Sequence, residues 1–334
     1  MIRKTLNFGN LDINTPFFQA PLSGYTDRPM RVLARRFGSP LTFTGVLLDK
    51  ISLHKGAIKK LLSNPGPDES PVGAQILGSN PETMAKAAVM FEKYGFDLID
   101  LNFACPAPKV LRRGRGGALL LEPNRAIEIY KRVRDAVKCP VTVKIRTCFK
   151  HNDGTEEHFW KICDGLAGYG IDGIVIHGRS VKQMYRNKAD WQTPMEVKQK
   201  YPNIPIVGSG DIMSAQDAFD RFEQTGLDGI LIARGAIGNP WIFSEAKALF
   251  EGKPLPKPPS LAEQRQVMLD HLSMLLEIKE EMKAVRYFRK FAAGYCKRHP
   301  QRKKTLLAIM ACKKAEQLHN VIDNCFSQDA ALAE

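Results

Sequence analysis

The stretch Leu98-Ile99-Asp100-Leu101-Asn102-Phe103-Ala104-Cys105 is an apolar run that ends in polar residues, and it belongs to one of eight short runs along the chain. Most runs are followed by a segment with apolar residues at helical spacing. Strands that alternate with helices favour a (β/α)8 TIM barrel; a doubly wound sheet is the alternative. The runs are Phe17–Ala20, Leu41–Val46, Val72–Leu77, Leu98–Phe103, Val141–Arg146, Gly173–His177, Ile204–Gly208 and Gly229–Ala233, and helical segments include Pro81–Lys93, Asn124–Val137, Glu156–Tyr169 and Ala215–Thr225.

The carboxyl ends of these runs carry the polar residues. In a TIM barrel those ends face one common opening, where the chemistry takes place. We therefore expect one site, built from residues that are far apart in the sequence. Its members are Pro21, Leu22, Ser23, Gln75, Asn102, Cys105, Lys144, Arg146, His177, Arg179, Ser209, Gly210, Asp211, Ala233 and Arg234.

Cys105 lies just past the end of its run, ahead of a loop rich in Gly and Arg. A thiol with an ordinary pKa near ~8.5 is mostly protonated at neutral pH, so it can serve as an acid or as a nucleophile. We expect Gly114, Gly116 and Gly117 to give the loop the flexibility to close over a substrate.

The last two runs end in Gly208-Ser209-Gly210-Asp211 and Ala233-Arg234-Gly235-Ala236. TIM barrels commonly bind phosphate at this pair of strands through backbone N–H groups. Lys144 at a buried strand end suits a flavin, whose reduced ring carries negative charge. An isolated His177 would be read as a core residue, but its place at a strand end favours a role in the site.

The composition indicates a cytoplasmic protein. Of 334 residues 44% are hydrophobic, yet no stretch approaches the ~20 apolar residues of a membrane span, and no apolar signal sequence follows Met1. Seven cysteines without framework spacing indicate reduced thiols, so we expect neither a disulfide nor a metal site.

The chain exceeds the usual ~250 residues of a barrel, which leaves room for a second module. We predict a catalytic barrel over residues 1–250, a proline-rich linker over 251–260 and a helical domain over 261–334. The linker, Gly252-Lys253-Pro254-Leu255-Pro256-Lys257-Pro258-Pro259-Ser260, cannot continue a helix.

The helical domain is strongly basic. The chain carries a formal charge of +14, and from Met282 to Ala315 there are eleven Lys or Arg residues but no Asp or Glu. On a helix over Lys283–Arg298, the side chains of Arg286, Lys290 and Lys297 share a face with Lys283. Such a face suits a phosphate backbone or is simply solvated; basic clusters near the predicted opening, including Arg112, Arg113 and Arg115, favour nucleic acid.

These motifs resemble those of the flavin-dependent tRNA-dihydrouridine synthases, and the resemblance covers nearly the whole chain. Ala20–Pro29 is similar to the family's opening FMN segment, and Cys105-Pro106-Ala107-Pro108-Lys109-Val110 to its catalytic signature. Val143–Arg146, His177–Arg179 and Gly235–Phe243 resemble its later motifs.

The resemblance implies an FMN-binding barrel with an RNA-binding helical domain, which acts on RNA, with tRNA favoured, and takes electrons from NADPH. Asn102 and Arg179 correspond to positions near the substrate base, Lys109 belongs to the catalytic signature, and Cys105 corresponds to the general acid. We further expect a monomer. The flavin positions are Pro21, Leu22, Ser23, Gln75, Lys144, His177, Ser209, Gly210, Asp211, Ala233 and Arg234.

The implied reaction reduces the C5–C6 double bond of a uridine, with hydride delivered to C6 and a proton from Cys105 to C5. A stacked base must first be flipped into the site. The chain departs from the family at Ala104, where Gly is usual, and at Ser209, where Asn is frequent. Ala104 adds a methyl group beside the nucleobase site and bears on substrate fit, whereas the shorter Ser209 bears on a contact with the flavin. Neither departure removes a group that the reaction requires.

Two other functions compete with this one. An FMN barrel oxidoreductase that acts on a free pyrimidine, similar to dihydroorotate dehydrogenase, explains the flavin residues but not the basic helical domain. A non-catalytic RNA-binding barrel has no need to keep Cys105, Lys144 and His177 together. Bound flavin and activity on free uridine distinguish the three.

Overall fold

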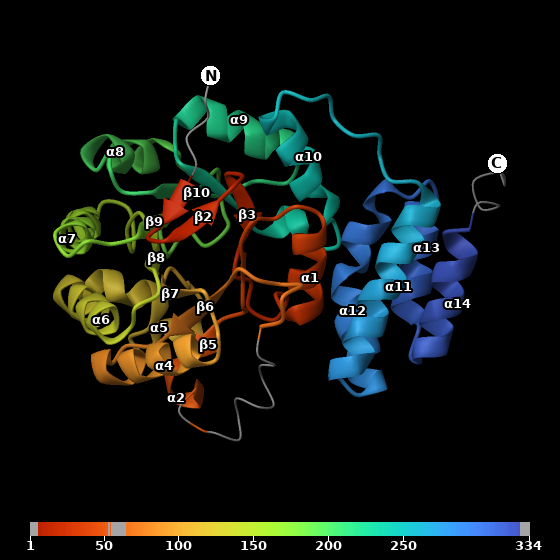
Figure 1. Cartoon of the computed structure of the whole chain (residues 1–334), viewed down its shortest axis with the longest axis horizontal. Coiled ribbons are helices and arrows are strands. Elements are labelled where there is room, and N and C mark those ends of the chain that lie inside the picture. The colour runs from red at the N-terminus through yellow and green to blue at the C-terminus, as the bar shows by residue number, and fades with distance from the viewer. Residues whose placement is uncertain (1–5, 53, 55–64, 328–334) are drawn as a thin grey trace.

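The computed structural model describes residues 6–52, 54 and 65–327. A sheet of nine parallel strands forms a nearly closed barrel, with helices around it (Figure 1). The strands are β3 (Phe17–Gln19), β4 (Thr42–Phe43), β5 (Leu47–Leu48), β6 (Val72–Leu77), β7 (Leu98–Phe103), β8 (Val141–Arg146), β9 (Gly173–His177), β10 (Ile206–Ser209) and β11 (Gly229–Ile232).

The strand order decides between the two predicted arrangements. Neighbouring strands run β3-β11-β10-β9-β8-β7-β6-β4, which is chain order around a ring, and the Gln19 amide donates to the Leu41 carbonyl across the remaining gap (3.3 Å). A doubly wound sheet reverses its order at a switch point. The barrel prediction is therefore confirmed.

The helices outside the barrel are α1 (Arg28–Arg36), α2 (Asp49–Ser52), α4 (Pro81–Lys93), α5 (Pro108–Leu111), α6 (Pro123–Ala136), α7 (Thr155–Ala167), α8 (Gln192–Lys200), α9 (Ala215–Thr225) and α10 (Trp241–Phe250), with short 3-10 helices η1 (Gly116–Leu121) and η2 (Arg234–Ala236). Two of them, α4 and α9, have the predicted bounds because each begins at a side-chain cap. Asn80 caps α4, and Ser214 forms a capping box on α9.

The prediction of one continuous second strand over Leu41–Val46 is wrong, because the structure has two short strands, β4 and β5, in this region. The chain forms β4 and then leaves the sheet before β5, because the Gly45 amide donates to the Thr26 carbonyl (3.0 Å) and not to a strand. This detour brings the segment against the loop that follows β3, where the Leu22 carbonyl lies next to Gly45.

An additional hairpin, β1 (Leu6–Phe8) and β2 (Leu11–Ile13), covers the amino end of the barrel. Phe8 and Ile13 are buried, and their cluster includes Phe18 and Val207 from inside the barrel. The hairpin closes that end, so the opposite, carboxyl end is the one left for a site.

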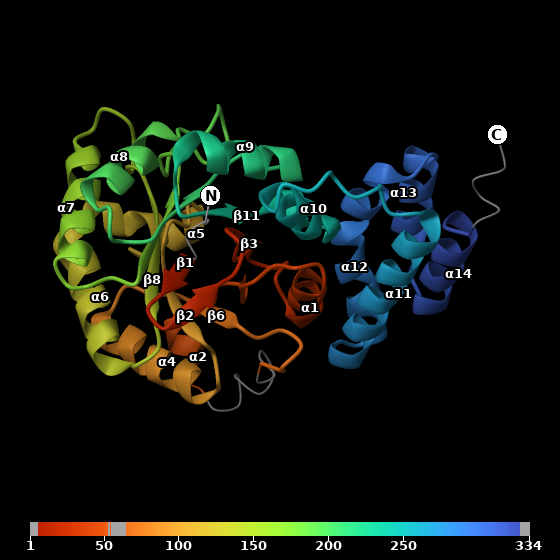
Figure 2. The same cartoon turned by 45° about the horizontal axis from the view of Figure 1, so that its top comes forward.

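Four further helices, α11 (Leu261–Ile278), α12 (Glu281–Tyr295), α13 (Arg302–Ala311) and α14 (Ala315–Cys325), pack beside α1 and α10, with η3 (Cys296–Arg298) after α12 (Figures 1 and 2). The predicted helical character of this region is confirmed. Within the described residues, no helix is both long and apolar enough to cross a membrane.

The helical region meets the barrel through close backbone contact. A Cβ at Gly294 would lie 1.9 Å from the Ile237 carbonyl oxygen, so only glycine fits there. Aromatic rings pack edge to face beside it, with Tyr25 against Phe291 at 5.8 Å between ring centroids. This tight contact fixes where α12 lies relative to the opening of the barrel.

Candidate active site at the carboxyl end of the barrel

A cavity of roughly 870 Å³, partly open to solvent, lies at the carboxyl ends of the strands. It brings together all eleven predicted flavin positions together with Asn102 and Cys105. Their roles remain predictions, but their shared location is a property of the structure. The lining residues are Ala20, Pro21, Leu22, Ser23, Val46, Gln75, Asn102, Ala104, Cys105, Pro106, Lys144, Arg146, His177, Tyr185, Ser209, Gly210, Asp211, Ile212, Leu231, Ala233 and Arg234.

A buried hydrogen-bond chain crosses the floor of this cavity. The Asp100 carboxylate accepts from the Thr142 hydroxyl (2.7 Å) and from Gln75 Nε2 (2.6 Å). Gln75 Oε1 in turn accepts from Asn102 Nδ2 at 2.7 Å. Because each donor has a single matching acceptor, the orientations of the Gln75 and Asn102 amides are fixed.

Asn102 also holds the Cys105 loop. Its Oδ1 accepts from the backbone amides of Ala104 (3.1 Å) and Cys105 (2.9 Å). The Cys105 carbonyl accepts from the Gly117 amide at 3.0 Å. The half-buried thiol of Cys105 therefore stands on a loop that is tied at both sides.

Gly114, Gly116 and Gly117 were predicted to make the loop after Cys105 flexible. The structure shows tight packing around Gly116 and Gly117. Gly116 and Gly117 are buried in η1, and a Cβ at Gly116 would lie 2.9 Å from that of Cys105. A Cβ at Gly117 would meet Val181 at 2.5 Å. These residues are glycines because of close packing and, at Gly116, a φ of 58°. Gly114 alone has open space around it.

The side chain of Lys144 lines the cavity from β8 and forms no hydrogen bond to another described residue, although the charge of Asp100 acts on it. Burial, with a further contribution from Arg146, lowers the pKa of Lys144 to about 8. Burial also raises the pKa of the neighbouring Asp100 carboxyl to about 6. An ammonium held here without a partner suits an anionic ligand group.

His177 has a buried Nε2 atom with no partner in the described residues. Its pKa lies well below the ordinary value because burial and the nearby Lys144, Arg146, Arg179 and Arg234 disfavour the charged form. The imidazole is therefore neutral at physiological pH. A ligand with a polar edge would give this orphaned nitrogen its partner.

The turn after β10 is built around Asp211. Its carboxylate pairs with Arg179 (2.6 Å) and Arg234 (3.3 Å), and these bonds hold its pKa below the ordinary range despite burial. Gly210 (φ 146°) and Asp211 (φ 54°) both have positive φ, which turns the backbone toward Ala189. Asp211 thus acts as a support for Arg234, whose exposed guanidinium remains available to an anion.

Arg179 does not line the cavity. Its side chain is buried, and besides Asp211 it donates to the carbonyls of Arg186 (3.2 Å) and Asn187 (2.5 Å). Its Nη1 atom is buried without a partner in the described residues, so its role near the substrate base stays a prediction. Its other contacts hold the loop between β9 and α8 in place.

Two further lining residues shape the site: Arg146, which was expected there, and Tyr185, which was not. Arg146 is buried and donates to the carbonyls of Ala104 (2.8 Å), Ser180 (2.9 Å) and Met184 (3.0 Å), so it joins the Cys105 loop to the next one. Tyr185 lies at the rim, 56% exposed, with Arg234 over its ring at 5.0 Å. Arg146 stood among the strand-end residues, but Tyr185 carried no signal beyond its place in a loop.

The predicted RNA-contacting residues lie outside the cavity. Lys109 is exposed on α5, and Arg286 and Lys297 are exposed on the helical region. Lys290 differs from them, because its ammonium donates to the Gly24 carbonyl (3.1 Å) and lies 4.3 Å from the centroid of the Tyr287 ring. Lys290 therefore contributes to the contact between the helical region and the barrel.

The family model described as dihydrouridine synthase matches residues 18–331. This chain belongs to the dihydrouridine synthase family. The resemblance seen in the motifs, and with it the prediction of an enzyme of this kind, is confirmed. The cavity described above therefore holds the strand-end residues and the Cys105 thiol of a dihydrouridine synthase.

Relatives of similar length agree with the assignment. The tRNA-dihydrouridine synthase B of Shewanella oneidensis is 34% identical over 299 residues, which cover 89% of this chain and 91% of that protein. That of Vibrio vulnificus is 34% identical over 327 residues, covering 96% of this chain and all of that protein (100%). A probable tRNA-dihydrouridine synthase of Rickettsia conorii is 33% identical and covers 87% of each chain.

Solved structures share the fold of this dihydrouridine synthase. An old yellow enzyme homologue from Zymomonas mobilis superposes with a TM-score of 0.56 at 15% identity, over 77% of this chain and 94% of that one. A 2-naphthoyl-CoA reductase complex gives a TM-score of 0.59 at 14% identity, over 76% of this chain and 52% of that one. At such identity the likeness concerns the barrel alone.

Proposed function

We propose that this enzyme reduces the C5–C6 double bond of specific uridines in tRNA to give dihydrouridine, with FMN as its flavin and NADPH as the reductant. The observation that carries the proposal is the cavity whose lining includes both Cys105 and the eleven predicted flavin positions. The family assignment and the relatives named as tRNA-dihydrouridine synthases support it. We further propose that the enzyme acts as a monomer in the cytoplasm.

The polar atoms of the cavity fit a flavin. The orphaned Nε2 of neutral His177 and the unpaired ammonium of Lys144 would contact the polar edge of the ring system. Arg234 and the backbone after β10 and β11 would hold the phosphate, with Asp211 orienting Arg234. When bound and reduced, the flavin supplies the hydride for C6 of the uracil.

Cys105 is the group of this chain that provides the second hydrogen. Its thiol would donate a proton to C5 as negative charge builds there, and it would be reprotonated from solvent. Asn102 and Arg146 both hold the peptide group that joins Ala104 to Cys105, Asn102 at the Cys105 amide and Arg146 at the Ala104 carbonyl. These contacts fix the distance over which the proton moves.

A uracil base can enter the cavity only after it has left the base stack of the RNA. A uracil within folded RNA would be flipped into the opening, where Tyr185 at the rim and Ala104 next to Cys105 limit its position. Ala104 is buried, so its methyl group occupies space in the cavity wall. Through this methyl group, the replacement of the family's usual glycine by Ala104 would change how the substrate fits.

The remaining residues serve the tRNA itself. We assign residues 1–250 to the FMN-binding catalytic domain, 251–260 to a linker and 261–334 to an RNA-binding domain. Exposed Lys109, Arg286 and Lys297 would contact phosphates around the opening. The net charge of +14 favours the approach of tRNA.

Mass spectrometry of tRNA tests the proposal directly. Purified protein, with its released flavin identified by mass, is incubated with NADPH and tRNA that lacks dihydrouridine. The proposal expects FMN and a gain of two hydrogens at defined uridines, with no reaction on free uridine or orotate. Turnover of the free pyrimidine but not of tRNA would contradict it, as would protein that binds no flavin.

A further inference from the structure

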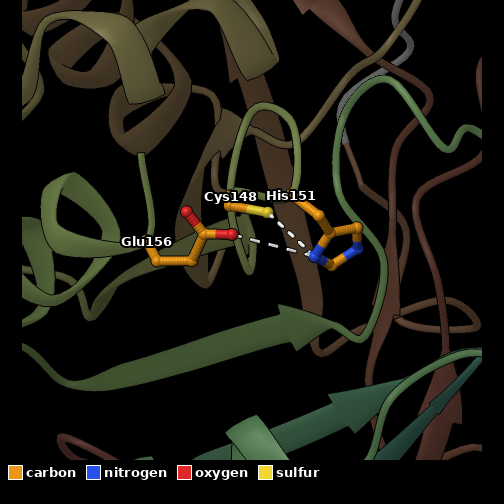
Figure 3. A group of neighbouring side chains, drawn as sticks. All are labelled: Cys148, His151 and Glu156. Atoms are coloured by element: carbon orange, nitrogen blue, oxygen red, sulfur yellow. Dashed lines mark hydrogen bonds and ion pairs between the residues drawn. The ribbon is translucent and has the colours of Figure 1, made fainter. Parts of the chain in front are cut away.

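Cys148, His151 and Glu156 bring three metal-ligating groups together between β8 and the start of α7. Cys148 Sγ lies 3.6 Å from His151 Nδ1, which is 3.8 Å from Glu156 Oε1. All three atoms are within 4.8 Å of one another, and the side chains point toward a common centre (Figure 3). The proposed reaction uses none of them.

The spacing of these atoms fits a tetrahedral ion. With a Zn–S bond of about 2.3 Å and a Zn–N bond of about 2.0–2.1 Å, sulfur and nitrogen ligands stand about 3.6 Å apart. The Cys148–His151 separation already has this value. The carboxylate oxygen would need to move inward by about 0.5 Å for a Zn–O bond of ordinary length. The Glu156 side chain is 42% exposed and has room for that movement.

The second ring nitrogen of His151 has the partner expected of a metal ligand. Nε2 lies 3.3 Å from Gln183 Oε1, and the Ser180 amide donates to the same oxygen, which identifies it as an acceptor. Nε2 therefore carries the proton, and Nδ1 presents its lone pair to Cys148 and Glu156. Metal-bound histidines typically donate their other N–H in this way.

Within this cluster the Cys148 thiol lies 3.6 Å from His151 Nδ1, and a protonated His151 would pair with Glu156, so a bound cation would replace both contacts. A neutral His151 turns the lone pair of Nδ1 toward the Glu156 carboxylate, whose Oε1 is held by the Asn152 amide at 3.0 Å. Cys148 is buried.

We propose that Cys148, His151 and Glu156 bind one divalent transition-metal ion of the zinc type, with the fourth position open to water. Binding converts the Cys148 thiol into a thiolate and releases its proton to solvent. Thiolate and imidazole ligands select zinc over Mg²⁺ or Ca²⁺, which take oxygen ligands. The sequence-based expectation of no metal site had overlooked this set, because it contains one cysteine and one exposed histidine.

The ion would brace one wall of the active-site cavity. The Cys148 carbonyl accepts from the Val181 amide (3.0 Å), and His151 contacts Gln183 of the same loop. That loop leads to Tyr185 at the rim, and Arg146 holds its Met184 carbonyl. Zinc at this position would therefore join the two loops that follow β8 and β9. Its role is structural, and it stands independently of the proposed reaction.

Zinc content and ligand identity test the proposal. The full-length, flavin-loaded protein is stripped with a chelator, incubated with Zn²⁺ alone and gel-filtered, and the zinc per chain is measured by mass spectrometry. Zinc K-edge absorption then reports the ligand atoms, which flavin colour does not obscure. We expect one zinc per chain with one sulfur at about 2.3 Å. Excess Mg²⁺ should not displace it.

Matched variants locate the site. Cys148→Ala and His151→Ala should lose the bound zinc, whereas Cys139→Ala, which removes another half-buried thiol at the far end of β8, should retain it. His151 is exposed, so its variant should fold even if Cys148→Ala does not, as the melting temperature will show. Wild-type protein that binds no zinc, or a His151→Ala variant that keeps one zinc with a sulfur ligand, would overturn the proposal.

Discussion

The side-chain oxygen of Asn102 accepts the backbone amide of Cys105 at 2.9 Å, so the position of the proposed acid depends on the orientation of one amide group. Contacts on the floor of the cavity set that orientation, because Asn102 Nδ2 donates to Gln75 and Gln75 donates to Asp100. Two neighbouring strands, β6 and β7, thereby determine where the thiol stands. The chain of bonds explains why polar residues occupy an otherwise apolar barrel interior.

Asn102→Ala should impair turnover more than flavin binding. The variant loses the acceptor for the Ala104 and Cys105 amides, and displacement of a reacting group by about 1 Å can cost ~10²-fold in rate. Turnover on tRNA and the flavin content are the two measurements. Asn80→Ala is the matched control, since it removes another side-chain cap, about 1 kcal/mol of stability, at a residue that does not line the cavity. Equal losses of activity in both variants would mean that only stability matters.

Cys105→Ala should keep its flavin and still let NADPH reduce it, but lose dihydrouridine formation. Removal of a general acid commonly costs about 10²–10⁴ in rate. Dihydrouridine in tRNA is measured by mass spectrometry, and flavin reduction by absorbance. Cys139→Ala, a half-buried thiol before β8, should behave as wild type. Near-native turnover of Cys105→Ala would remove the thiol from the mechanism.

Gly116→Ala should displace Cys105, whereas Gly114→Ala should not. Both glycines have positive φ (58° and 62°), so an alanine costs similar backbone strain at each. Only at Gly116 does the new methyl group meet the Cys105 Cβ, at 2.9 Å; at Gly114 nothing lies within 4 Å. Comparable melting temperatures but a much lower turnover for Gly116→Ala are expected. If the loop's freedom were what matters, Gly114→Ala would be the slower variant.

Because of Lys144, the free energy of unfolding of the flavin-free protein should change with pH in the alkaline range. Its pKa of about 8 lies below the ordinary 10.5, so the folded protein binds this proton less tightly than the unfolded chain does. The cost of the buried ammonium is fully present below about pH 8 and is relieved as the pH rises toward 10.5. The advantage of Lys144→Met in free energy of unfolding, measured with denaturant, should therefore shrink between pH 8 and 10. A constant difference would show an ordinary lysine pKa.

The sequence predicted the central strands of the barrel well. β6 to β9 have the predicted bounds, because each is a mainly apolar run whose residues, apart from half-buried Lys144, are buried on both faces. The β1–β2 hairpin was missed because each strand has only three residues, too few for an alternating pattern to stand out. The break before β5 depends on the Gly45–Thr26 contact, which no local pattern reveals.

The candidate site was predictable where it follows from topology. Residues at strand ends meet in any barrel of this kind, which is why the flavin positions and Cys105 line one cavity. The contacts of long side chains were not predictable. Arg179 and Lys290 were expected to bind substrate, yet each bonds to a backbone carbonyl of this chain. Their partners lie on loops, whose path the sequence pattern does not specify.

The basic face of the helical region provides the last prediction. Arg286 and Lys297 are exposed, and neither forms an ion pair among the described residues, so both can contact phosphate. Arg286→Glu combined with Lys297→Glu should weaken tRNA binding and lower the salt dependence of log K by roughly 1.4–1.8, about 0.7–0.9 for each of the two lost contacts. Lys290 is left out of this pair because its bond to Gly24 also holds the helical region to the barrel.

A charge-matched control separates local contact from overall charge in that experiment. Lys86→Glu with Lys93→Glu makes the same change in net charge on exposed residues of α4, which lies on the outside of the barrel far from α12 (Figure 1). This variant should keep a near-native salt slope, and both variants should oxidise NADPH normally without RNA, since the cavity is unchanged. Equal losses of affinity in the two variants would mean that tRNA responds only to the total charge, and contact with RNA would then rest on residues around the cavity opening.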